Sequence, residues 1–180
     1  SGPGKQRNRE SATKPILVVD DGEANRRLIE LVLGRAGAVV TSVANGLGAI
    51  ETLKEKDFDL ILMDMQMPVM DGYSATRQIR SAGLATPIVA LTGNAMKGDR
   101  EKCIEAGCSD FLTKPVNIDE LLMRTVHFIG RADGGQNSLS VDGVSIVENE
   151  FEGEDVTARP ATKRDKRFWS SRADSFDATD

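Results

Sequence analysis

Leu60-Ile61-Leu62-Met63-Asp64-Met65-Gln66-Met67-Pro68-Val69-Met70-Asp71-Gly72 is the stretch of sequence that decides the fold. Residues 60–63 are uniformly apolar and too few for a helix, which predicts a strand buried on both faces, as in a parallel sheet. Asp64 follows where this strand ends, and ligands bind at that edge of open α/β sheets. Pro68 and Gly72 indicate a loop, and Asp71 can cap the next helix. The residues alone leave Asp64 open as a structural cap, a nucleophile or a metal ligand.

Short apolar runs alternate with helical patterns along residues 14–132. The further predicted strands are 15–19, 38–43, 87–91 and 110–113, and the predicted helices are 23–36, 45–56, 72–82, 99–106 and 117–130. In the first helix, the apolar stripe expected to face the core is Leu28, Leu31, Val32 and Ala36. Five strands alternating with five helices predict an α/β fold, a doubly wound five-stranded parallel sheet between helices, because parallel crossovers are right-handed.

The two ends of the chain differ in composition from the middle. Residues 1–13 are polar, begin like a cleavage scar and are expected to be flexible. Residues 14–132 form the predicted domain. Residues 133–180 carry 11 acidic and 6 basic side chains, which predicts an acidic linker or tail that is largely disordered. Within it, residues 144–147 favour a short strand, and the basic and aromatic patch 163–169 is either a docking element or part of a solvated tail.

Composition and charge bound the function. The net charge of −5 argues against a nucleic-acid surface, and no apolar run approaches the about 20 residues that span a bilayer. No signal peptide is visible, so we expect a cytoplasmic segment without membrane contact, although a parent protein could be membrane-attached. Cys103 and Cys108 lack a metal-binding or redox spacing and predict two reduced thiols. His127, the only histidine, is expected on the solvated side of the last helix.

Five polar side chains follow the predicted strands and should meet at one edge of the sheet: Asp20, Asp21, Asp64, Thr92 and Lys114. Two carboxylates about 4 Å apart repel by about 4 kcal/mol at an effective dielectric constant near 20. A hard divalent cation such as Mg²⁺ relieves this repulsion and commonly binds phosphate oxygens as well. With a phosphoryl group in the site, Lys114 and Thr92 can contact its oxygens, and Asp64 can attack it to form an acyl phosphate.

This set resembles the receiver domain of two-component response regulators. The resemblance rests on Asp20-Asp21, Asp64, Thr92 and Lys114-Pro115, with 43, 28 and 22 residues between successive elements, and on the loop at residues 67–72. It covers residues 14–132 and implies a flavodoxin-like sheet with strand order 2-1-3-4-5. The residues around Asp64 and residues 90–96 resemble receivers attached to hybrid sensor histidine kinases more than those of DNA-binding regulators.

The resemblance also implies a role for each site residue. Asp64 is the expected phosphoacceptor, and Asp20, Asp21, Asp64 and the backbone carbonyl of Gln66 are the expected ligands of Mg²⁺, with Mn²⁺ as a substitute. Lys114 is expected to contact the phosphoryl group, and the Lys114-Pro115 bond to be cis. Thr92 and Phe111 are the expected switch residues. Gln66 and Asn94 occupy positions that tune the lifetime of the phosphoryl group.

The expected partner is a histidine kinase or a histidine phosphotransfer protein, with the chain as a monomer or weak dimer. The chain lacks a transmitter histidine, so the enzymatic activity expected of the segment itself is phosphoryl transfer to its own Asp64. The alternatives are a stand-alone single-domain response regulator and a protein-interaction module that acts by contact. A flavin site and an aspartyl phosphatase are disfavoured, because Asp20-Asp21-Gly22-Glu23 would repel a phosphate and no second acid follows Asp64 at the phosphatase spacing.

Overall fold

The computed structural model describes residues 14–94, 96–130, 138–141 and 144–147. Its centre is a sheet of five parallel strands in the order β2-β1-β3-β4-β5. The strands are β1 (Lys14–Val19), β2 (Ala38–Val43), β3 (Leu60–Asp64), β4 (Ile88–Thr92) and β5 (Asp110–Thr113). The helices between and after them are α1 (Glu23–Arg35), α2 (Gly46–Glu55), α3 (Gly72–Ser81), α4 (Lys97–Ala106) and α5 (Ile118–Gly130). The predicted fold class and strand order are confirmed.

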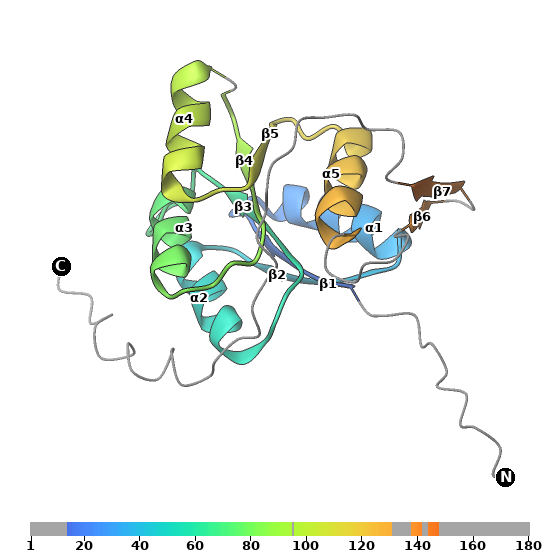
Figure 1. The fold of residues 1–180 in the computed structure, drawn as a ribbon, viewed down its shortest axis with the longest axis horizontal. Helices are drawn as coiled ribbons and strands as arrows, with labels where there is room; N and C mark the ends of the chain where they lie inside the picture. Colours follow the sequence, from blue (N-terminus) through green and yellow to red (C-terminus); the bar gives the residue numbers. More distant parts are fainter. Residues whose placement is uncertain (1–13, 95, 131–137, 142–143, 148–180) are drawn as a thin grey trace, which may run out of the picture.

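Helices cover both faces of the sheet, with α1 and α5 on one face and α2, α3 and α4 on the other (Figure 1). Successive side chains of a strand point to opposite faces, so each strand supplies both layers. In β1, Leu17 and Val19 pack with α2, α3 and α4, whereas Ile16 and Val18 pack with α1 and α5. The sheet edge that carries the polar residues is therefore fixed from both sides.

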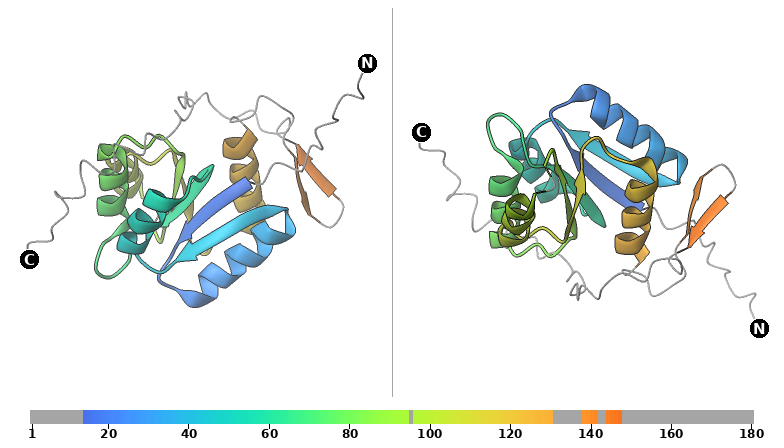
Figure 2. Two further views of the ribbon diagram at one scale, coloured as in Figure 1. Left: turned by 90° about the horizontal axis from the view of Figure 1, so that it is seen from below. Right: turned by 90° about the horizontal axis from the view of Figure 1, so that it is seen from above.

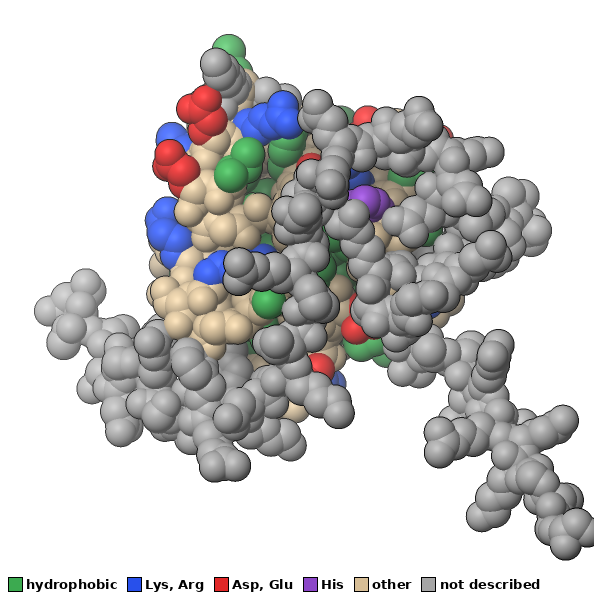
Figure 3. All heavy atoms as spheres, in the orientation of Figure 1, with side chains coloured by type: hydrophobic (Ala, Val, Ile, Leu, Met, Phe, Trp, Pro, Cys, Tyr) green, Lys and Arg blue, Asp and Glu red, His purple; other side chains and the backbone are tan. Residues whose placement is uncertain are grey.

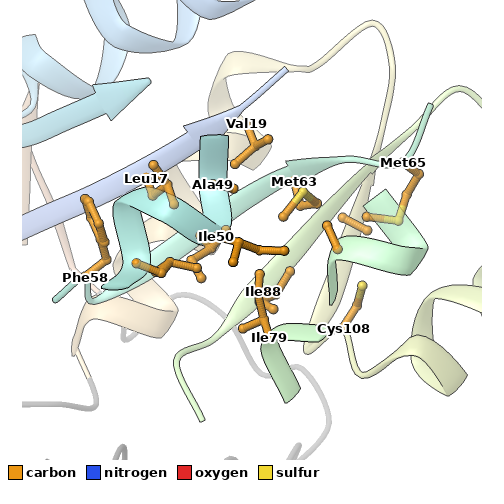
Figure 4. Close-up of a cluster of buried hydrophobic side chains, with 14 of the residues drawn as sticks. Leu17, Val19, Ala49, Ile50, Phe58, Met63, Met65, Ile79, Ile88 and Cys108 are labelled. Atoms are coloured by element: carbon orange, nitrogen blue, oxygen red, sulfur yellow. The ribbon is translucent and has the colours of Figure 1, made fainter. Parts of the chain in front are cut away.

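The central strand β3 explains why its sequence is apolar without interruption. Every residue from Leu60 to Asp64 is buried, because helices cover both faces of the strand. Met63 lies among the side chains of the α2 and α3 face, next to Ala49, Ile50 and Ile88 (Figure 4). The buried carboxylate of Asp64 thus ends a strand that is otherwise entirely hydrocarbon.

Helix α1 buries only part of the predicted stripe: Ala36 is buried and Val32 packs against the core. Leu28 and Leu31 are 43% and 53% exposed, and the residues that face the core are instead Ile29 and Leu33. Apolar residues fill five of the six positions from 28 to 33, so two phases fit the helical period equally well in the sequence. The contacts of α1 with β1 and β2 select one phase, which the pattern alone does not.

Two details of the C-terminal half were not predicted. Helix α4 begins at Lys97, two residues before the expected start at Asp99. The expected strand at Val144–Val147 exists as β7, and it pairs antiparallel with β6 (Ser138–Val141), which was not predicted. The hairpin lies beside α5 (Figure 2). The predicted flexible segment 1–13 and patch 163–169 lie outside the described residues.

No helix within the described part of the chain has both the length and the apolar character needed to cross a membrane.

Candidate functional site

The carboxyl edge of the sheet brings the predicted acids together. Asp20 follows β1, Asp21 comes next, and Asp64 is the last residue of β3. Each of the three carboxylates offers an oxygen, and these oxygens all lie within 4.8 Å of one another. Asp20 and Asp64 are each 1% exposed, whereas Asp21 is exposed. The cleft is therefore a buried pair of carboxylates with a third at its mouth.

Three donors from the start of α1 hold Asp20 in place. Its Oδ1 accepts a hydrogen bond of 2.8 Å from the backbone N–H of Gly22, and its Oδ2 accepts one of 3.1 Å from the side-chain amide of Asn25. Arg26 donates to the backbone carbonyl of Asp20 at 2.7 Å. These bonds fix the orientation of a carboxylate that would otherwise be repelled by Asp64.

Lys114, just after β5, pairs with both buried acids. Its Nζ lies 2.9 Å from Oδ2 of Asp64 and 3.3 Å from Oδ2 of Asp20. Burial raises the pKa of Asp64, even though Lys114 and the N–H of Gln66 pull it down. For Lys114, burial lowers the pKa, but the two carboxylates outweigh burial and the pKa is raised. Lys114 is thus a charged ammonium that compensates a carboxylate pair short of water.

The loop after β3 packs tightly against Asp64. The backbone N–H of Gln66 donates to Asp64 Oδ1 at 3.0 Å, so the first turn of the loop fixes the carboxylate plane. A Cβ on Gly72 would lie only 2.2 Å from the backbone oxygen of Asp64, so this position accepts glycine alone. The predicted cap of α3 is present, since the Asp71 carboxylate accepts from Ser74 N–H at 2.7 Å. The loop therefore places α3 directly beneath the site.

Thr92, the last residue of β4, is 4% exposed, and its hydroxyl is engaged within its own loop. It donates to the carbonyl of Asn94 at 3.0 Å and accepts from the N–H of Asn94 at 3.3 Å. The backbone N–H of Lys114 donates to the Thr92 carbonyl at 2.7 Å, and the Lys114–Pro115 peptide bond is cis. In this state, none of these bonds of the Thr92 hydroxyl reaches the acidic pair.

The donor set fits a hard divalent cation. Three carboxylates supply only oxygen ligands, which Mg²⁺ prefers, and two of them are buried with a single ammonium between them. The backbone carbonyl of Gln66 stays a predicted ligand. An oxygen-rich cleft of this kind carries excess negative charge that a cation would neutralise.

Comparison with known proteins identifies the chain. The profile of the response regulator receiver domain matches residues 16–126. The chain belongs to this family. The sensor histidine kinase RcsC of Salmonella typhi is 42% identical over 106 residues, which is 59% of this chain but 11% of that kinase. The chain thus corresponds to a small part of that relative's length.

Two solved receiver structures bear on the site. The receiver domain of sensor histidine kinase PA1611 from Pseudomonas aeruginosa, solved with magnesium coordinated in its active-site cleft, is 45% identical. The match covers 66% of this chain and 99% of that one, with a TM-score of 0.62. The receiver domain of Ssk1 from Saccharomyces cerevisiae, solved in complex with the phosphotransfer protein Ypd1, is 31% identical, with 64% and 88% covered and a TM-score of 0.62.

The predicted switch aromatic of this receiver domain, Phe111 on β5, is half-buried at the edge of the α4 face. The guanidinium carbon of Arg100, on α4, lies 5.3 Å from the centre of the Phe111 ring. At this distance a cation–π interaction contributes about 0.5–1 kcal/mol at an exposed site. The aromatic ring is thus held between the core and a charge on α4.

Sequence reasoning missed the arginines of the receiver domain and misplaced its histidine. Arg26 bonds the backbone of Asp20, six residues earlier, and its spacing from Asp20-Asp21 was the only signal in the sequence. Arg100 contacts Phe111 on another element, and no signal in the sequence pointed to it. His127 is half-buried rather than solvated, and its ring meets the edge of Phe128 at 5.0 Å. The prediction was wrong in part, because the His127 ring packs against the ring of Phe128 instead of lying free in solvent.

Proposed function

We propose that this receiver domain accepts a phosphoryl group from a phosphohistidine onto the carboxylate of Asp64. The observation that carries the proposal is the cleft itself, in which three carboxylates have oxygens within 4.8 Å and Lys114 lies 2.9 Å from Asp64. A purely structural acid at this position would need only one partner. The additional acids and the half-buried lysine are what a transferring phosphoryl group requires.

Each side chain of the cleft has a task in this transfer. The Asp64 carboxylate attacks phosphorus, the phosphorus–nitrogen bond breaks, and the donor imidazole keeps the electron pair and takes up a proton. Lys114 compensates the negative charge of the phosphoryl oxygens, and Asp20, held by Gly22 and Asn25, stays fixed while Asp64 reacts. Mg²⁺, held by Asp20, Asp21, Asp64 and the Gln66 carbonyl, supplies charge neutralisation and orientation of the phosphoryl oxygens when bound.

The product is an acyl phosphate, whose oxygens offer new acceptors beside β4. The Thr92 hydroxyl would then exchange its bond to the Asn94 carbonyl for one to a phosphoryl oxygen, which moves the loop before α4. Phe111 lies on the next strand, so a change in that loop shifts the balance between its outward and inward positions. The surface altered by phosphorylation is formed by α4, β5 and α5.

We further propose that the phosphodonor is a histidine kinase or a histidine phosphotransfer protein and that the parent is a hybrid sensor histidine kinase. Support for the parent comes from RcsC, a sensor histidine kinase that is 42% identical over the matched residues. Support for the partner comes from the Ssk1 receiver domain, which was solved with a phosphotransfer protein. We also propose that this receiver domain lies in the cytoplasm and that its parent protein is either soluble or attached to a membrane.

Intact-protein mass spectrometry after incubation with acetyl phosphate and Mg²⁺ tests the acceptor. The wild type should gain one phosphoryl group that is lost in mild base, and Asp64→Asn should gain none. Asp71→Asn is the matched control, because Asp71 is an exposed acid of the same loop and asparagine caps a helix equally well. Removal of Mg²⁺ with a chelator should abolish the gain. Equal labelling of wild type and Asp64→Asn would overturn the proposal.

A further inference from the structure

The two cysteines of the chain lie together between α3, α4 and β5, away from the acidic cleft. Cys103 is on α4 and Cys108 follows the helix, and both are free and buried. Both belong to the same cluster of buried side chains, and each thiol shifts the pKa of the other. Cys108 also lies at the end of the core cluster that Figure 4 shows, with its Sγ 3.9 Å from the hydroxyl of Thr76. The thiols therefore form a pair, which their linear spacing did not suggest.

The way α4 ends explains the pairing. Gly107 adopts a left-handed conformation with φ of 108°, and the N–H groups of Gly107 and Cys108 donate to the carbonyls of Ile104 and Cys103, both at 3.0 Å. This is a Schellman motif, in which the residue after the glycine contacts the residue five positions before it. The hydrogen bond and standard bond lengths limit the distance between the two Cα atoms to at most about 6.9 Å. Native disulfides have Cα–Cα distances up to about 6.8 Å.

Helix α3 shows what this contact usually consists of. It ends in the same motif, with Gly83 at φ of 82° and the N–H of Leu84 donating to the carbonyl of Ile79 at 3.3 Å. There the paired residues, Ile79 and Leu84, are both aliphatic and pack on the core. In α4 the same two positions hold thiols. Aliphatic side chains would be sufficient for packing there, so the thiols add redox reactivity to this contact.

The surroundings of the thiols keep them unreactive while α4 is in place. Burial raises the pKa of Cys103, and burial together with the neighbouring thiol raises that of Cys108 to about 12. The route to reactivity is movement of α4. Among the residues of α4 whose burial is described, only Cys103 and Ala106 are buried, and the N-cap residue Met96 forms no side-chain capping bond. Such a helix opens at low cost compared with the strands beneath it.

We propose that Cys103 and Cys108 are a thiol–disulfide exchange site that forms a reversible intrachain disulfide with a small-molecule disulfide as oxidant. Cys108 is 9% exposed and Cys103 1%, so the thiolate of Cys108 attacks one sulfur of the oxidant and releases its other half as a thiolate. Cys103, after losing its proton, attacks Cys108 Sγ and releases the second half. Two electrons pass to the oxidant, and two protons leave the cysteines, so the products are one protein disulfide and two small thiols.

The disulfide would fix the C-terminal end of α4 to the segment that leads into β5. It would leave the N-terminal end of α4, next to the Thr92 loop, unconstrained. The inference goes beyond the proposed phosphoryl transfer, because the site uses neither Asp64 nor its metal ligands. Asp64→Asn should therefore leave the thiol equilibrium unchanged, and failure of one proposal does not imply failure of the other.

The test equilibrates the protein in buffers of reduced and oxidised glutathione, followed by acid quenching and intact mass spectrometry. The wild type should lose two hydrogens in mass without a glutathione adduct, and dithiothreitol should reverse the change. Because the chain has only two cysteines, an intrachain disulfide can join no other pair. Cys103→Ser should instead accumulate a mixed disulfide with glutathione at Cys108. At half-oxidation, the square of the reduced glutathione concentration divided by the oxidised glutathione concentration gives the effective concentration of the thiol pair.

The same titration in concentrated urea provides the decisive comparison. If the Schellman motif positions the sulfurs for a disulfide, the effective concentration should be at least about tenfold higher in the native protein than in the unfolded chain. An equal or lower native value would overturn the proposal, because the fold would then oppose the bond. Persistent glutathione adducts, disulfide-linked dimers or the absence of any oxidation in the native protein would overturn it equally.

Discussion

Helices α3 and α4 are both ten residues long, lie side by side over the same face of the sheet and end in the same motif, yet they are attached differently (Figure 1). Helix α3 buries Gly72, Ala75, Thr76 and Ile79, and Asp71 caps its start. In α4 the residues known to be buried are Cys103 and Ala106, both in its last turn. Acidic and basic side chains gather over α4 (Figure 3). Helix α4, whose N-terminal end follows the Thr92 loop, is thus held mainly at its C-terminal end.

What holds that end is Arg80 of α3. Its guanidinium donates to the carbonyl of Gly107 at 2.9 Å and to those of Leu84 and Thr86 at 2.7 and 2.8 Å. Burial lowers the pKa of this arginine, and the three carbonyls supply the partners that a buried guanidinium needs. The N-terminal end of α4 can therefore respond while the bond from Arg80 to the Gly107 carbonyl is intact, whereas exposure of the thiols at the C-terminal end requires that bond to open.

The largest expected effect comes from the same substitution in the two helices. Gly72→Ala should lower the free energy of unfolding by about 3–5 kcal/mol, because the new Cβ would lie 2.2 Å from the Asp64 oxygen. Gly98→Ala, near the start of α4, meets nothing within 4 Å and should raise it by about 0.5–1 kcal/mol through helix propensity. Urea denaturation followed by circular dichroism measures both. Similar effects of the two changes would show that the starts of α3 and α4 are packed alike.

The next largest effect concerns the anchor of α4. Arg80→Met should lower the free energy of unfolding by about 2–3 kcal/mol, because buried carbonyls lose their donor. Hydrogen exchange should rise mainly in the last turn of α4. Arg77→Met, an exposed arginine of α3, is the control and should change stability by less than about 0.5 kcal/mol. Unchanged exchange in α4 would show that Arg80 does not anchor it.

Exchanging the caps should bring the two helices closer together. Asp71→Ala removes the cap of α3 and should cost about 1 kcal/mol, whereas Met96→Ser supplies one to α4 and should add about 0.5–1 kcal/mol. Met96 is 69% exposed, so its replacement costs little packing. Thermal unfolding compares the variants with wild type. A destabilising Met96→Ser would mean that the side chain of Met96 has a role that its exposure hides.

The smallest expected effect is at the contact between α4 and β5. Arg100→Ala removes the cation over Phe111 and should cost about 0.5 kcal/mol of stability. If the inward ring belongs to the phosphorylated state, beryllofluoride with Mg²⁺ should bind about twofold more tightly to the variant, as measured by calorimetry. Glu101→Ala, exposed on the same helix, is the control. Weaker binding to Arg100→Ala would indicate that the contact supports the phosphorylated state.

Local sequence signals were sufficient for most of the fold and for the acidic edge. Apolar runs of four or five residues predicted β1, β3 and β4, because a strand covered on both faces has no polar positions, whereas the edge strands β2 and β5 contain polar residues. The convergence of Asp20, Asp64 and Lys114 followed from strand ends alone, since parallel strands share one edge. The roles of these residues in transfer stay predictions until the acceptor is labelled.

The sequence did not predict contacts between different helices and strands, nor which of two possible apolar faces a helix buries. Helix α1 has two possible apolar stripes, and β1 and β2 select the one with Ile29 and Leu33. Strand β6 was not predicted, although Ser138–Val141 alternates polar and apolar residues, because a run of four residues is too short to indicate a strand without its partner β7. Arg80 and Arg100 look like surface residues of polar helices, and their roles arise from neighbours on other elements.

By itself the sequence determined the order of strands and helices and the acidic ends of the strands, because burial and periodicity act within a few residues. Only the tertiary structure decided how the elements meet: the thiol pair at the end of α4, the guanidinium that fixes that end, and the ring that lies beneath Arg100. These contacts depend on the packing of residues from different elements. They therefore contribute to stability only in the folded chain, and local sequence does not reveal them.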